Sequence, residues 1–276
     1  MAMSIRTNIA SLNAQRNLYT TQNTLDSSLS RLSSGFRITK AGDDAAGLGI
    51  STKLESQIRS YSQAVRNAND GISVIQSTES ALNEGANILT RLRELAMQSA
   101  SDGVGDSERA YVQKESTALV AELQRISQVT EYNGTKLLNG ANATLDFQVG
   151  IYSTTNDAIS FNTLNATTGA AGLNVSGMSM ASKASALAAL ASVDSALASV
   201  SSARADLGAN GNRFASAISN IQSFAESLSA ANSRIKDVDV AEETSRMSRS
   251  QILLQAGVSV LAQANQMPQM ALKLLG

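Results

Sequence analysis

Residues 32–51 read LSSGFRITKAGDDAAGLGIS and interrupt a chain whose flanking segments both have helical patterns. Gly35 suits the position just after a helix that ends near Leu32, because glycine readily adopts the left-handed conformation found there. Asp43 or Asp44 then suits the N-terminal cap of a following helix. Gly47 and Gly49 would allow close backbone contact. The stretch therefore predicts a joint: a helix end, a short extended connection and a new helix start.

Two other interpretations of this stretch are a phosphate-binding loop and a cation site. A phosphate-binding loop is disfavoured because the G-x-x-x-x-G-K-[ST] pattern is absent, no strand precedes it, and two carboxylates would repel a phosphate. A weak cation site stays open as an alternative. However, Asp43 and Asp44 are adjacent, so on a helix their side chains would point about 100° apart.

The composition excludes several classes of function. Lys and Arg total 22 against 23 Asp and Glu, which gives no electrostatic footprint for nucleic acid or an anionic membrane. There is no His, Cys or Trp, so the most common general base, thiol nucleophiles, disulfides and cysteine-ligated zinc are all absent. No Ser lies in a recognisable nucleophile motif. We therefore expect that the protein is not an enzyme and that it has no catalytic, cofactor or metal site.

Long helices built from small side chains are expected throughout. The chain has one Pro and 4% aromatic residues, so helices can run far and the core must consist of Leu, Ile, Val and Ala. Apolar residues recur at steps of three and four in five segments, which is typical of helix bundles and coiled coils. These segments cover roughly residues 5–32, 58–89, 112–126, 190–235 and 254–275.

Two segments break the helical period. DGVGD (102–106) predicts a turn, with Asp106 as the N-cap of the third helix. Alternating Leu145, Phe147, Ile159 and Phe161 predict a β-hairpin over about 143–163, closed near Asn156–Asp157. The predicted fold is mainly α: long antiparallel helices form a rod-like bundle with a β-hairpin, and the two terminal helices pair as a coiled coil.

The terminal helices do not look stable alone. Each helix offers about six large apolar side chains, and the burial of each would contribute about 2 kcal/mol. Fixing the backbone of roughly 35 residues costs about 1–2 kcal/mol per residue. The helix hydrogen bonds return about 1 kcal/mol each. These terms roughly cancel, so we expect the terminal helices to become ordered only when they pack against each other and against further copies. The predicted coiled-coil residues are Ile5, Ile9, Leu12, Leu25, Leu29, Leu32, Leu254, Val258, Leu261, Leu272 and Leu275.

The N-terminal segment lacks the basic and apolar regions of a secretory signal peptide. No uninterrupted apolar run approaches the roughly 20 residues of a membrane helix. If the protein leaves the cell, we expect a route that cleaves no signal of this kind, and no membrane insertion.

Four further motifs, with the opening stretch, resemble one known family. They are MSIRTNIASLNAQRNL (3–18), LRELAMQSA (92–100), EYNGTKLLNG (131–140) and the segment from SRIKDVDV to the end (233–276). Together they resemble bacterial flagellins over roughly residues 3–150 and 180–276. The short middle implies a flagellin without large outer domains.

The resemblance implies a domain organisation. Residues 1–32 with 240–276 would form a terminal coiled-coil domain that lines an inner tube. Residues 33–50 would form a spoke, with Gly35, Arg37, Asp43, Asp44 and Gly47 as its key residues. Residues 51–239 would form a rod domain that includes the hairpin. In the family, the termini are disordered in the free monomer and order on assembly.

The resemblance also implies a function and partners. The chain would self-assemble into the extracellular flagellar filament for swimming motility, after type III export without a cleaved signal peptide. Its partners would be itself, an export chaperone, and cap and junction proteins, with no nucleic acid. Two alternatives stay open: a hook–filament junction protein, and a secreted ligand or adhesin recognised by a host receptor. Arg91, Leu95 and Glu115 match the family's motif for a vertebrate toll-like receptor.

Overall fold

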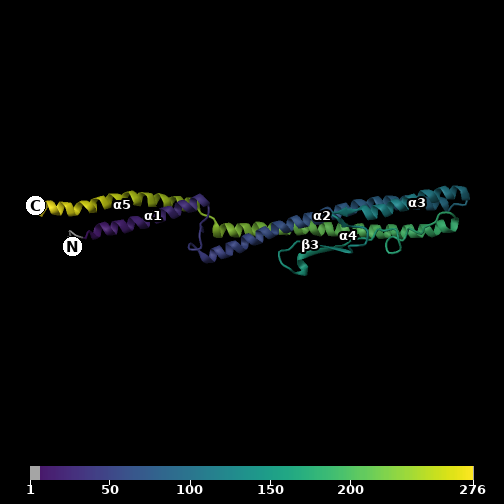
Figure 1. Ribbon diagram of the computed structural model, residues 1–276, viewed down its shortest axis with the longest axis horizontal. Coiled ribbons are helices and arrows are strands. Elements are labelled where there is room, and N and C mark those ends of the chain that lie inside the picture. The colour runs from purple at the N-terminus through teal and green to yellow at the C-terminus, as the bar shows by residue number, and fades with distance from the viewer. Residues whose placement is uncertain (1–6, 276) are drawn as a thin grey trace. The chain divides into compact units, whose positions relative to one another are not determined.

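The computed structural model describes residues 7–275, with side chains up to residue 266. The described residues form long helices: α1 (Ile9–Ser34), α2 (Ala45–Ser99), α3 (Asp106–Val129), α4 (Lys183–Lys236) and α5 (Val240–Leu275) (Figure 1). The strands are β1 (Glu131–Tyr132), β2 (Thr135–Lys136), β3 (Thr144–Gln148) and β4 (Ala158–Asn162), with a short 3-10 turn η1 (Thr155–Asp157) before β4. The predicted mainly α fold with a hairpin is confirmed.

The chain divides into two compact units. The first contains Met1–Ile58 with Glu226–Gly276, and the second contains Arg59–Ala225. Helices α2 and α4 therefore each contribute residues to both units. This division differs from the predicted boundaries at residues 50 and 240, and the assignment of tube, spoke and rod domains stays a prediction.

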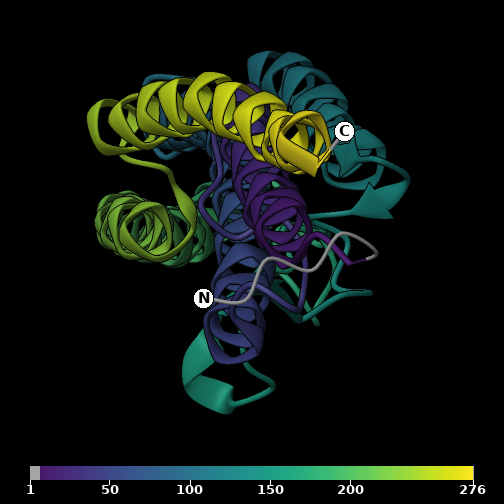
Figure 2. The same ribbon diagram turned by 90° about the vertical axis from the view of Figure 1, so that its left-hand side faces the viewer.

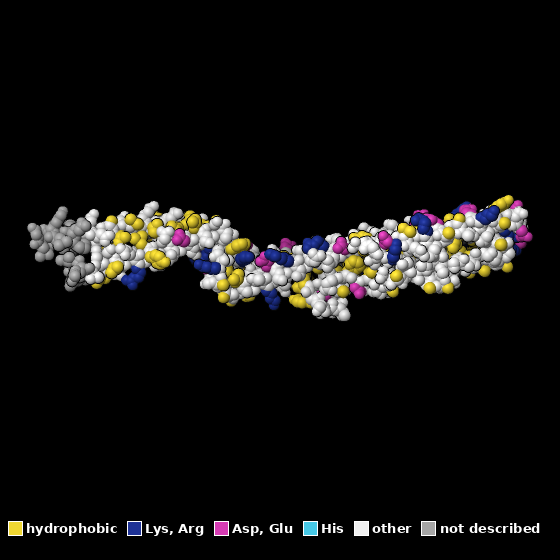
Figure 3. All heavy atoms as spheres, viewed as in Figure 1, with side chains coloured by type: hydrophobic (Ala, Val, Ile, Leu, Met, Phe, Trp, Pro, Cys, Tyr) yellow, Lys and Arg dark blue, Asp and Glu magenta, His cyan; other side chains and the backbone are white. Residues whose placement is uncertain are grey.

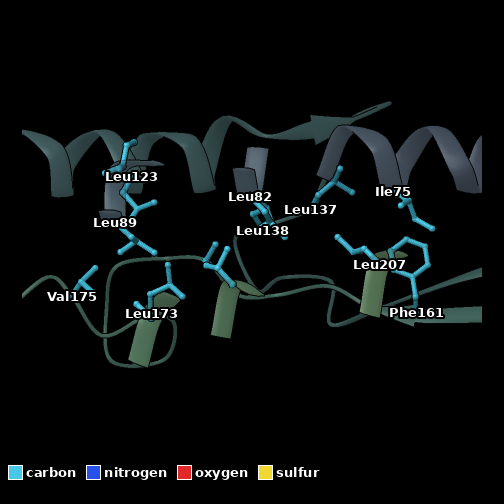
Figure 4. Close-up of a cluster of buried hydrophobic side chains, with 14 of the residues drawn as sticks. Ile75, Leu82, Leu89, Leu123, Leu137, Leu138, Phe161, Leu173, Val175 and Leu207 are labelled. Atoms are coloured by element: carbon cyan, nitrogen blue, oxygen red, sulfur yellow. The ribbon is translucent and has the colours of Figure 1, made fainter. Parts of the chain in front are cut away.

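The second unit has a continuous apolar core. Leu82 and Leu89 of α2, Leu123 of α3 and Leu207 of α4 belong to this core and are spread along its length (Figure 4). The connection between α3 and α4 completes the core with buried side chains, which are Leu137, Leu138, Phe161, Leu173 and Val175. The helical stripes face inward because residues three and four apart share one face of a helix. The core of this unit is thus closed within one chain.

The hairpin β3–β4 covers one part of this core. Its antiparallel register pairs Leu145 with Phe161 and Phe147 with Ile159, so the apolar residues of both strands share a face. The Phe147 ring stacks on Phe161 and meets Phe214 of α4 edge to face, each with 5.8 Å between ring centroids. The predicted hairpin is therefore confirmed, including its closure through η1.

A second hairpin, β1–β2, was not predicted from the sequence. Glu131 pairs with Lys136 and Tyr132 with Thr135, around the turn residues Asn133 and Gly134. Both turn residues have positive φ, at 47° and 78°. An Asn-Gly pair is the typical sequence of such a two-residue turn, so the signal was present in EYNGTK.

The turn between α2 and α3 is held by an arginine. Arg109 donates from Nε to the Ser99 carbonyl and from Nη2 to the Ser101 carbonyl, both at 3.0 Å. The prediction that Asp106 caps α3 is wrong, because Gly105 occupies the cap position and no side chain caps the helix. Asp106 instead accepts a hydrogen bond from Arg109 (3.1 Å).

Helix α4 is unusually apolar for a surface-accessible helix. It contains an 18-residue window with mean hydropathy 1.4, of which 28% is buried. One such helix is weak evidence for a membrane span, because a core helix of a helical bundle passes the same test.

Asp194, near the N-terminal end of α4, forms an ion pair with Arg93 of α2 at 2.7 Å. This ion pair anchors α4 to its neighbour within the second unit.

The contact between Gly71 and Phe214 yields a prediction. A Cβ on Gly71 would lie 2.8 Å from Cζ of Phe214, a fully buried ring. Gly71→Ala should therefore lower stability by about 1–3 kcal/mol through overpacking, despite alanine's better helix propensity. Thermal unfolding followed by circular dichroism measures the effect.

Gly208→Ala is the matched control, because nothing lies within 4 Å of its Cβ position on α4. That variant should gain up to about 1 kcal/mol from helix propensity alone. Equal shifts for the two variants would contradict the packing argument.

Candidate functional site: the terminal helix pair and its joint

Helices α1 and α5 lie side by side and run antiparallel (Figure 2, α1 purple and α5 yellow). Leu18 fills the space beside Gly257, where an added Cβ would lie 2.9 Å from the leucine Cδ2. The Ser11 hydroxyl donates to Asn265 Oδ1 (2.8 Å), and the Asn8 side-chain amide donates to the Ala264 carbonyl (2.8 Å). These contacts set the register of the two helices.

The seam between the two helices is narrow and partly polar. Its positions, buried or half-buried and spaced alternately by three and four, follow a coiled-coil repeat. On α1 they are Ser11, Ala14, Leu18, Thr21, Leu25, Ser28 and Leu32; on α5 they are Met247, Ser250, Leu254, Gly257, Leu261 and Ala264. Many of these side chains are small or polar, so the seam buries little apolar surface.

The predicted coiled-coil residues divide into three groups. Leu25, Leu32, Leu254 and Leu261 lie on the seam. Ile9, Leu12, Leu29 and Val258 lie off it, each more than half exposed in the single chain. Ile5 lies outside the described residues, as do the side chains of Leu272 and Leu275. Sequence reasoning missed Ser11 and Ser28, which are buried on the seam, because it followed the large apolar side chains alone.

Much of the apolar surface of the pair is uncovered. The side chains more than half exposed are Ile9, Leu12, Tyr19, Leu29, Val240, Ile252, Leu253, Val258 and Val260. Figure 3 shows hydrophobic side chains spread along the visible face of the pair. Extended apolar exposure of this kind marks a surface that contacts another molecule.

The joint begins where α1 ends. Gly35 adopts a left-handed conformation (φ 74°) and its N–H donates to the Arg31 carbonyl at 2.9 Å, as predicted for a helix C-cap. Residues 35–37 then pair with residues 236–238, which connect α4 to α5. The Arg37 N–H donates to the Lys236 carbonyl (2.6 Å), and the Val238 N–H donates to the Gly35 carbonyl (3.0 Å). The two chain connections are thus fixed to each other.

The Arg37 side chain ties the joint to two helix ends. Its Nη2 donates to the Ile235 carbonyl at 2.7 Å, in the last turn of α4, where carbonyls lack helical partners. The same nitrogen lies 3.9 Å from Asp44 Oδ2, just before α2. The guanidinium group also lies beside the negative end of the α4 helix dipole, which is a favourable electrostatic interaction.

The two aspartates have different structural tasks. Asp43 Oδ2 accepts hydrogen bonds from the Thr39 hydroxyl (2.9 Å), the Thr39 N–H (3.1 Å) and the Lys40 N–H (3.2 Å). These bonds, led by the Thr39 hydroxyl, lower the pKa of Asp43 below its usual value. Asp44 Oδ1 accepts from the Gly47 N–H (2.8 Å) and caps α2. Both carboxylates are therefore occupied in shaping the joint.

The two glycines at the start of α2 differ in their surroundings. Gly47 is buried, and a Cβ there would collide with the Asp44 carboxylate and lie 2.9 Å from Ile38 Cδ1. The predicted close approach at Gly49 is wrong, because nothing lies within 4 Å of its Cβ position. Of the two positions, only position 47 lacks the space for a side chain and therefore requires glycine.

A cleft of about 390 Å³ lies at the joint. Arg31 bridges its walls, with Nη2 3.7 Å from Asp43 and Nη1 4.0 Å from Glu243. Its lining is Arg31, Arg37, Ile38, Asp43, Asp44, Arg234, Asp237, Val238, Asp239, Glu242, Glu243 and Arg246. Charges of both signs alternate along these walls, and in the described part of the chain no three acidic side chains converge as metal ligands. The arrangement suits ion pairing.

The receptor motif predicted on the second unit is only partly exposed. Arg91 Nη2 of α2 lies 2.8 Å from Glu115 Oε1 of α3, and its Nη1 lies 2.9 Å from Glu94. These carboxylates, led by Glu94, raise the pKa of Arg91. The charged side chains are about half exposed, whereas Leu95 is 1% exposed. A molecule approaching this surface would meet Arg91 and Glu115 but not Leu95.

A helical unit with a closed core and a pair of terminal helices with uncovered apolar faces are typical of a structural, mainly helical protein. Residues 5–143 match the bacterial flagellin N-terminal helical region, and residues 190–275 match the bacterial flagellin C-terminal helical region. The chain is 41% identical over 273 residues to a flagellin of Halalkalibacterium halodurans, covering 99% of this chain and all of that one. The chain belongs to the bacterial flagellin family.

Two further similarities place the chain within this fold. It is 37% identical to flagellin D of Vibrio cholerae, with both chains fully covered over 377 aligned positions. Since this chain has 276 residues, it is a short form. A flagellar hook-associated protein structure from Vibrio parahaemolyticus gives a TM-score of 0.59 at 14% identity, over 71% of this chain and all of that one. That last similarity shows a shared fold alone.

Family membership gives the chain a structural role as a subunit of the flagellar filament, which is extracellular. The family is structural and non-enzymatic. The flagellin relatives support self-assembly and do not favour the junction-protein or adhesin alternatives.

Gly47→Ala should weaken the start of α2. The added methyl would displace the Asp44 carboxylate from its cap, and loss of an N-cap costs about 1 kcal/mol. Amide hydrogen exchange over residues 45–48 should then be about fivefold faster. Gly49→Ala should slow the same amides, because alanine there meets nothing and favours the helix. Faster exchange in both variants would contradict the cap mechanism.

Asp43 should make the joint sensitive to acid. Because its folded-state pKa is lowered, its stabilising contribution is present above the unfolded-state pKa and is lost as pH falls through the folded-state pKa. Protection of the Thr39 and Lys40 amides, measured relative to the unstructured chain at the same pH, should therefore decrease at acidic pH in the parent chain. Asp43→Asn should show fast exchange already near neutral pH, and a parent-like acid dependence in that variant would assign the effect to another group.

Proposed function

We propose that the α1–α5 pair is the element through which copies of this chain assemble into a filament for swimming motility. The carrying observation is that, among residues 7–266, the pair leaves nine large apolar side chains more than half exposed around a narrow seam, whereas the second unit has an extensive core within one chain. Burying these side chains against neighbours would supply about 1.5–3 kcal/mol per side chain when burial is complete. Assembly would therefore stabilise helices that one chain stabilises poorly.

The predicted coiled-coil residues then act in two ways. Leu25, Leu32, Leu254 and Leu261 close the seam within a chain, and Ile9, Leu12, Leu29 and Val258 contact neighbouring copies. The first set lies between α1 and α5, and the second lies on their outer faces. Ile5, Leu272 and Leu275 would extend these stripes toward the chain ends.

The joint serves as the spoke between the terminal pair and the rod. Gly35 and Gly47 supply the backbone conformations and space, Asp43 and Asp44 shape the turn and cap, and Arg37 ties the joint to α4. This proposal is supported by the hydrogen bonds that fix 35–37 to 236–238.

Seeded polymerisation of the purified chain tests the proposed function. The full chain should elongate short filament seeds into long filaments, seen by light scattering and electron microscopy. A variant lacking residues 1–32 and 240–276 should fail to elongate while keeping a cooperative thermal transition of its helical rod. Long filaments from the trimmed chain would contradict the role of the terminal pair. Failure of the full chain would favour the hook–filament junction protein.

Export would proceed through the flagellar type III apparatus, with an export chaperone, and assembly would involve cap and junction proteins. The N-terminal segment lacks the pattern of a cleaved signal peptide. Mass spectrometry of filament protein should find the N-terminal residues intact beyond removal of the initiator Met. A mature N-terminus well inside the helix α1 would contradict this route.

A second function, recognition by a vertebrate toll-like receptor, is supported by the exposed Arg91–Glu115 pair that bridges α2 and α3. In a receptor reporter assay on the monomer, Arg91→Ala should reduce the response about tenfold if a charged contact of about 1.4 kcal/mol is lost. Arg93→Ala is the matched control, since Arg93 is similarly exposed but pairs with Asp194 of α4. An unchanged response to Arg91→Ala, or equal losses in both variants, would contradict it.

A further inference from the structure

The chain contains three Asn–Gly steps, which begin at Asn133, Asn139 and Asn210. An asparagine before glycine is chemically labile, because glycine has no side chain to hinder the approach of its backbone nitrogen to the asparagine side-chain amide. The residue pair is the same at all three positions. The surrounding structure therefore decides which of the three steps can react.

Asn133 and Gly134 form the tip of the β1–β2 hairpin, and both are exposed. The Asn133 side chain makes no hydrogen bond within residues 7–266, and nothing lies within 4 Å of the Cβ position of Gly134. In a two-residue turn the hydrogen bond joins the flanking residues, here Tyr132 and Thr135, so it does not occupy the Gly134 N–H. The side-chain amide and the following backbone nitrogen are therefore both free and open to water.

The Asn139–Gly140 step, in contrast, is held by its neighbours. The Asn139 Oδ1 atom accepts a hydrogen bond from the Ala141 N–H at 2.9 Å. A Cβ on Gly140 would lie 2.7 Å from Nδ2 of Asn165, so the Asn165 side chain covers this glycine. The preceding residue, Leu138, is 1% exposed and belongs to the core. These contacts restrict the movement of the Asn139 side chain toward the next backbone nitrogen.

The Asn210–Gly211 step lies inside helix α4. Asn210 Nδ2 donates to the Asp206 carbonyl (2.8 Å), and its Oδ1 accepts from Arg213 Nη1 (3.0 Å). Within an α-helix the backbone N–H groups donate to carbonyls four residues earlier, so the Gly211 nitrogen is held in the helical ladder. A reaction at this step would require local unfolding of α4.

The β1–β2 hairpin can open without loss of the core. Its ladder has only two residue pairs, and none of its four strand residues is fully buried. The ion pair between Lys136 and Glu131 adds little stability, because the two side chains are 37% and 48% exposed. Opening is needed because Asn133 has a left-handed conformation (φ 47°), which it must leave for its side chain to reach the Gly134 nitrogen. A weak hairpin makes this movement accessible.

We propose that Asn133 is a site of spontaneous deamidation. The Gly134 backbone nitrogen, after losing its proton to a base in the solvent, attacks Cγ of Asn133. A C–N bond forms and closes a succinimide ring, while the side-chain nitrogen takes up a proton and leaves as ammonia. Water then adds to one of the two carbonyls of the ring and opens it, which gives aspartate or isoaspartate at position 133. The reaction requires only water and involves no change of oxidation state.

Each product changes the surface beside the hairpin in its own way. A carboxylate at position 133 joins that of Asp70, since both residues line a shallow cleft of about 550 Å³ together with Phe147. Aspartate tolerates the left-handed conformation, so this product keeps the turn. Isoaspartate adds a carbon to the main chain, and the two-residue turn then no longer fits the pairing of Tyr132 with Thr135.

The isoaspartyl product should also loosen the segment that follows the hairpin. The Leu137 N–H donates to the Thr130 carbonyl across the base of the hairpin (3.2 Å), and the Leu137 and Leu138 side chains are each 1% exposed. A displaced turn pulls on both side chains. Because subunits of an extracellular filament are not resynthesised in place, the modified fraction would rise with the age of the subunit.

Peptide mapping by mass spectrometry tests the site on the purified full-length chain. The protein is incubated in slightly alkaline buffer, which favours loss of the Gly134 proton, and is sampled over time. Asn133 should deamidate at least about tenfold faster than Asn139 and Asn210, because those two steps react only after more stable structure has opened. An isoaspartyl methyltransferase assay should detect isoaspartate in the peptide that contains position 133.

The same incubation in denaturant is the control for local sequence. The three steps should then react at similar rates, because unfolding removes the contacts that distinguish them. A preference for Asn133 that persists undiminished in denaturant would assign the selectivity to the neighbouring residues and overturn the structural argument. Equal rates at the three steps in the folded chain, or no modification of Asn133, would overturn the proposal as well.

Two variants separate the reaction from its consequences. Asn133→Gly removes the amide and keeps a residue that adopts the left-handed turn, so position 133 should show no mass change while Asn139 and Asn210 behave as in the parent. Freshly purified Asn133→Asp carries the new charge without the longer main chain and should keep parent-like amide protection at Leu137 and Leu138. In the isoaspartyl chain, isolated by chromatography, these amides should exchange at least about fivefold faster. Parent-like exchange in that chain would contradict the proposed loosening.

Discussion

The seam between α1 and α5 is too narrow to bury the large apolar side chains that these helices carry. Small and polar residues such as Ser11, Ser28 and Gly257 let the two backbones approach, but they leave Ile9, Tyr19, Ile252 and similar side chains on the outside. A helix pair with this distribution gains little from folding alone. We therefore propose that its stability depends on surfaces supplied by neighbouring copies, so that ordering would be coupled to assembly.

The second unit, in contrast, has an extensive apolar core within one chain. Its buried leucines, the Phe147–Phe161–Phe214 cluster and the two hairpins close a core that requires no second chain. The joint that follows α1 is held by directional hydrogen bonds and caps, and it has little apolar burial of its own. Gly35, Arg37 and Asp44 satisfy helix ends that would otherwise carry unpaired backbone groups. We expect the second unit of such a subunit to stay folded by itself, while the terminal helices order with their partners.

Sequence patterns predicted the helices, the β3–β4 hairpin and the caps at Gly35 and Asp44, because each depends on local residue type and spacing. They did not predict which face of α1 meets α5. Leu25 and Leu32 lie on the seam, but Ile9, Leu12 and Leu29 lie off it. The seam includes Ser11 and Ser28 instead, since close approach selects small side chains. Gly49, Asp106 and Leu95 were also misjudged or incompletely described. The burial of Leu95 depends on residues distant in sequence, which a local pattern does not contain. In contrast, Asp106 bonds Arg109 three residues on, and nothing lies within 4 Å of the Gly49 Cβ position.

Amide hydrogen exchange on the free monomer and on the filament tests the central claim most directly. If the helix pair depends on neighbouring copies, amides in 9–34 and 240–265 should exchange almost without protection in the monomer and become strongly protected in the filament. Amides around Leu82, Leu89 and Leu207 should be protected in both states, because their core lies within one chain. Strong protection of the helix pair in the free monomer would contradict the account, since it would show that the narrow seam is sufficient by itself.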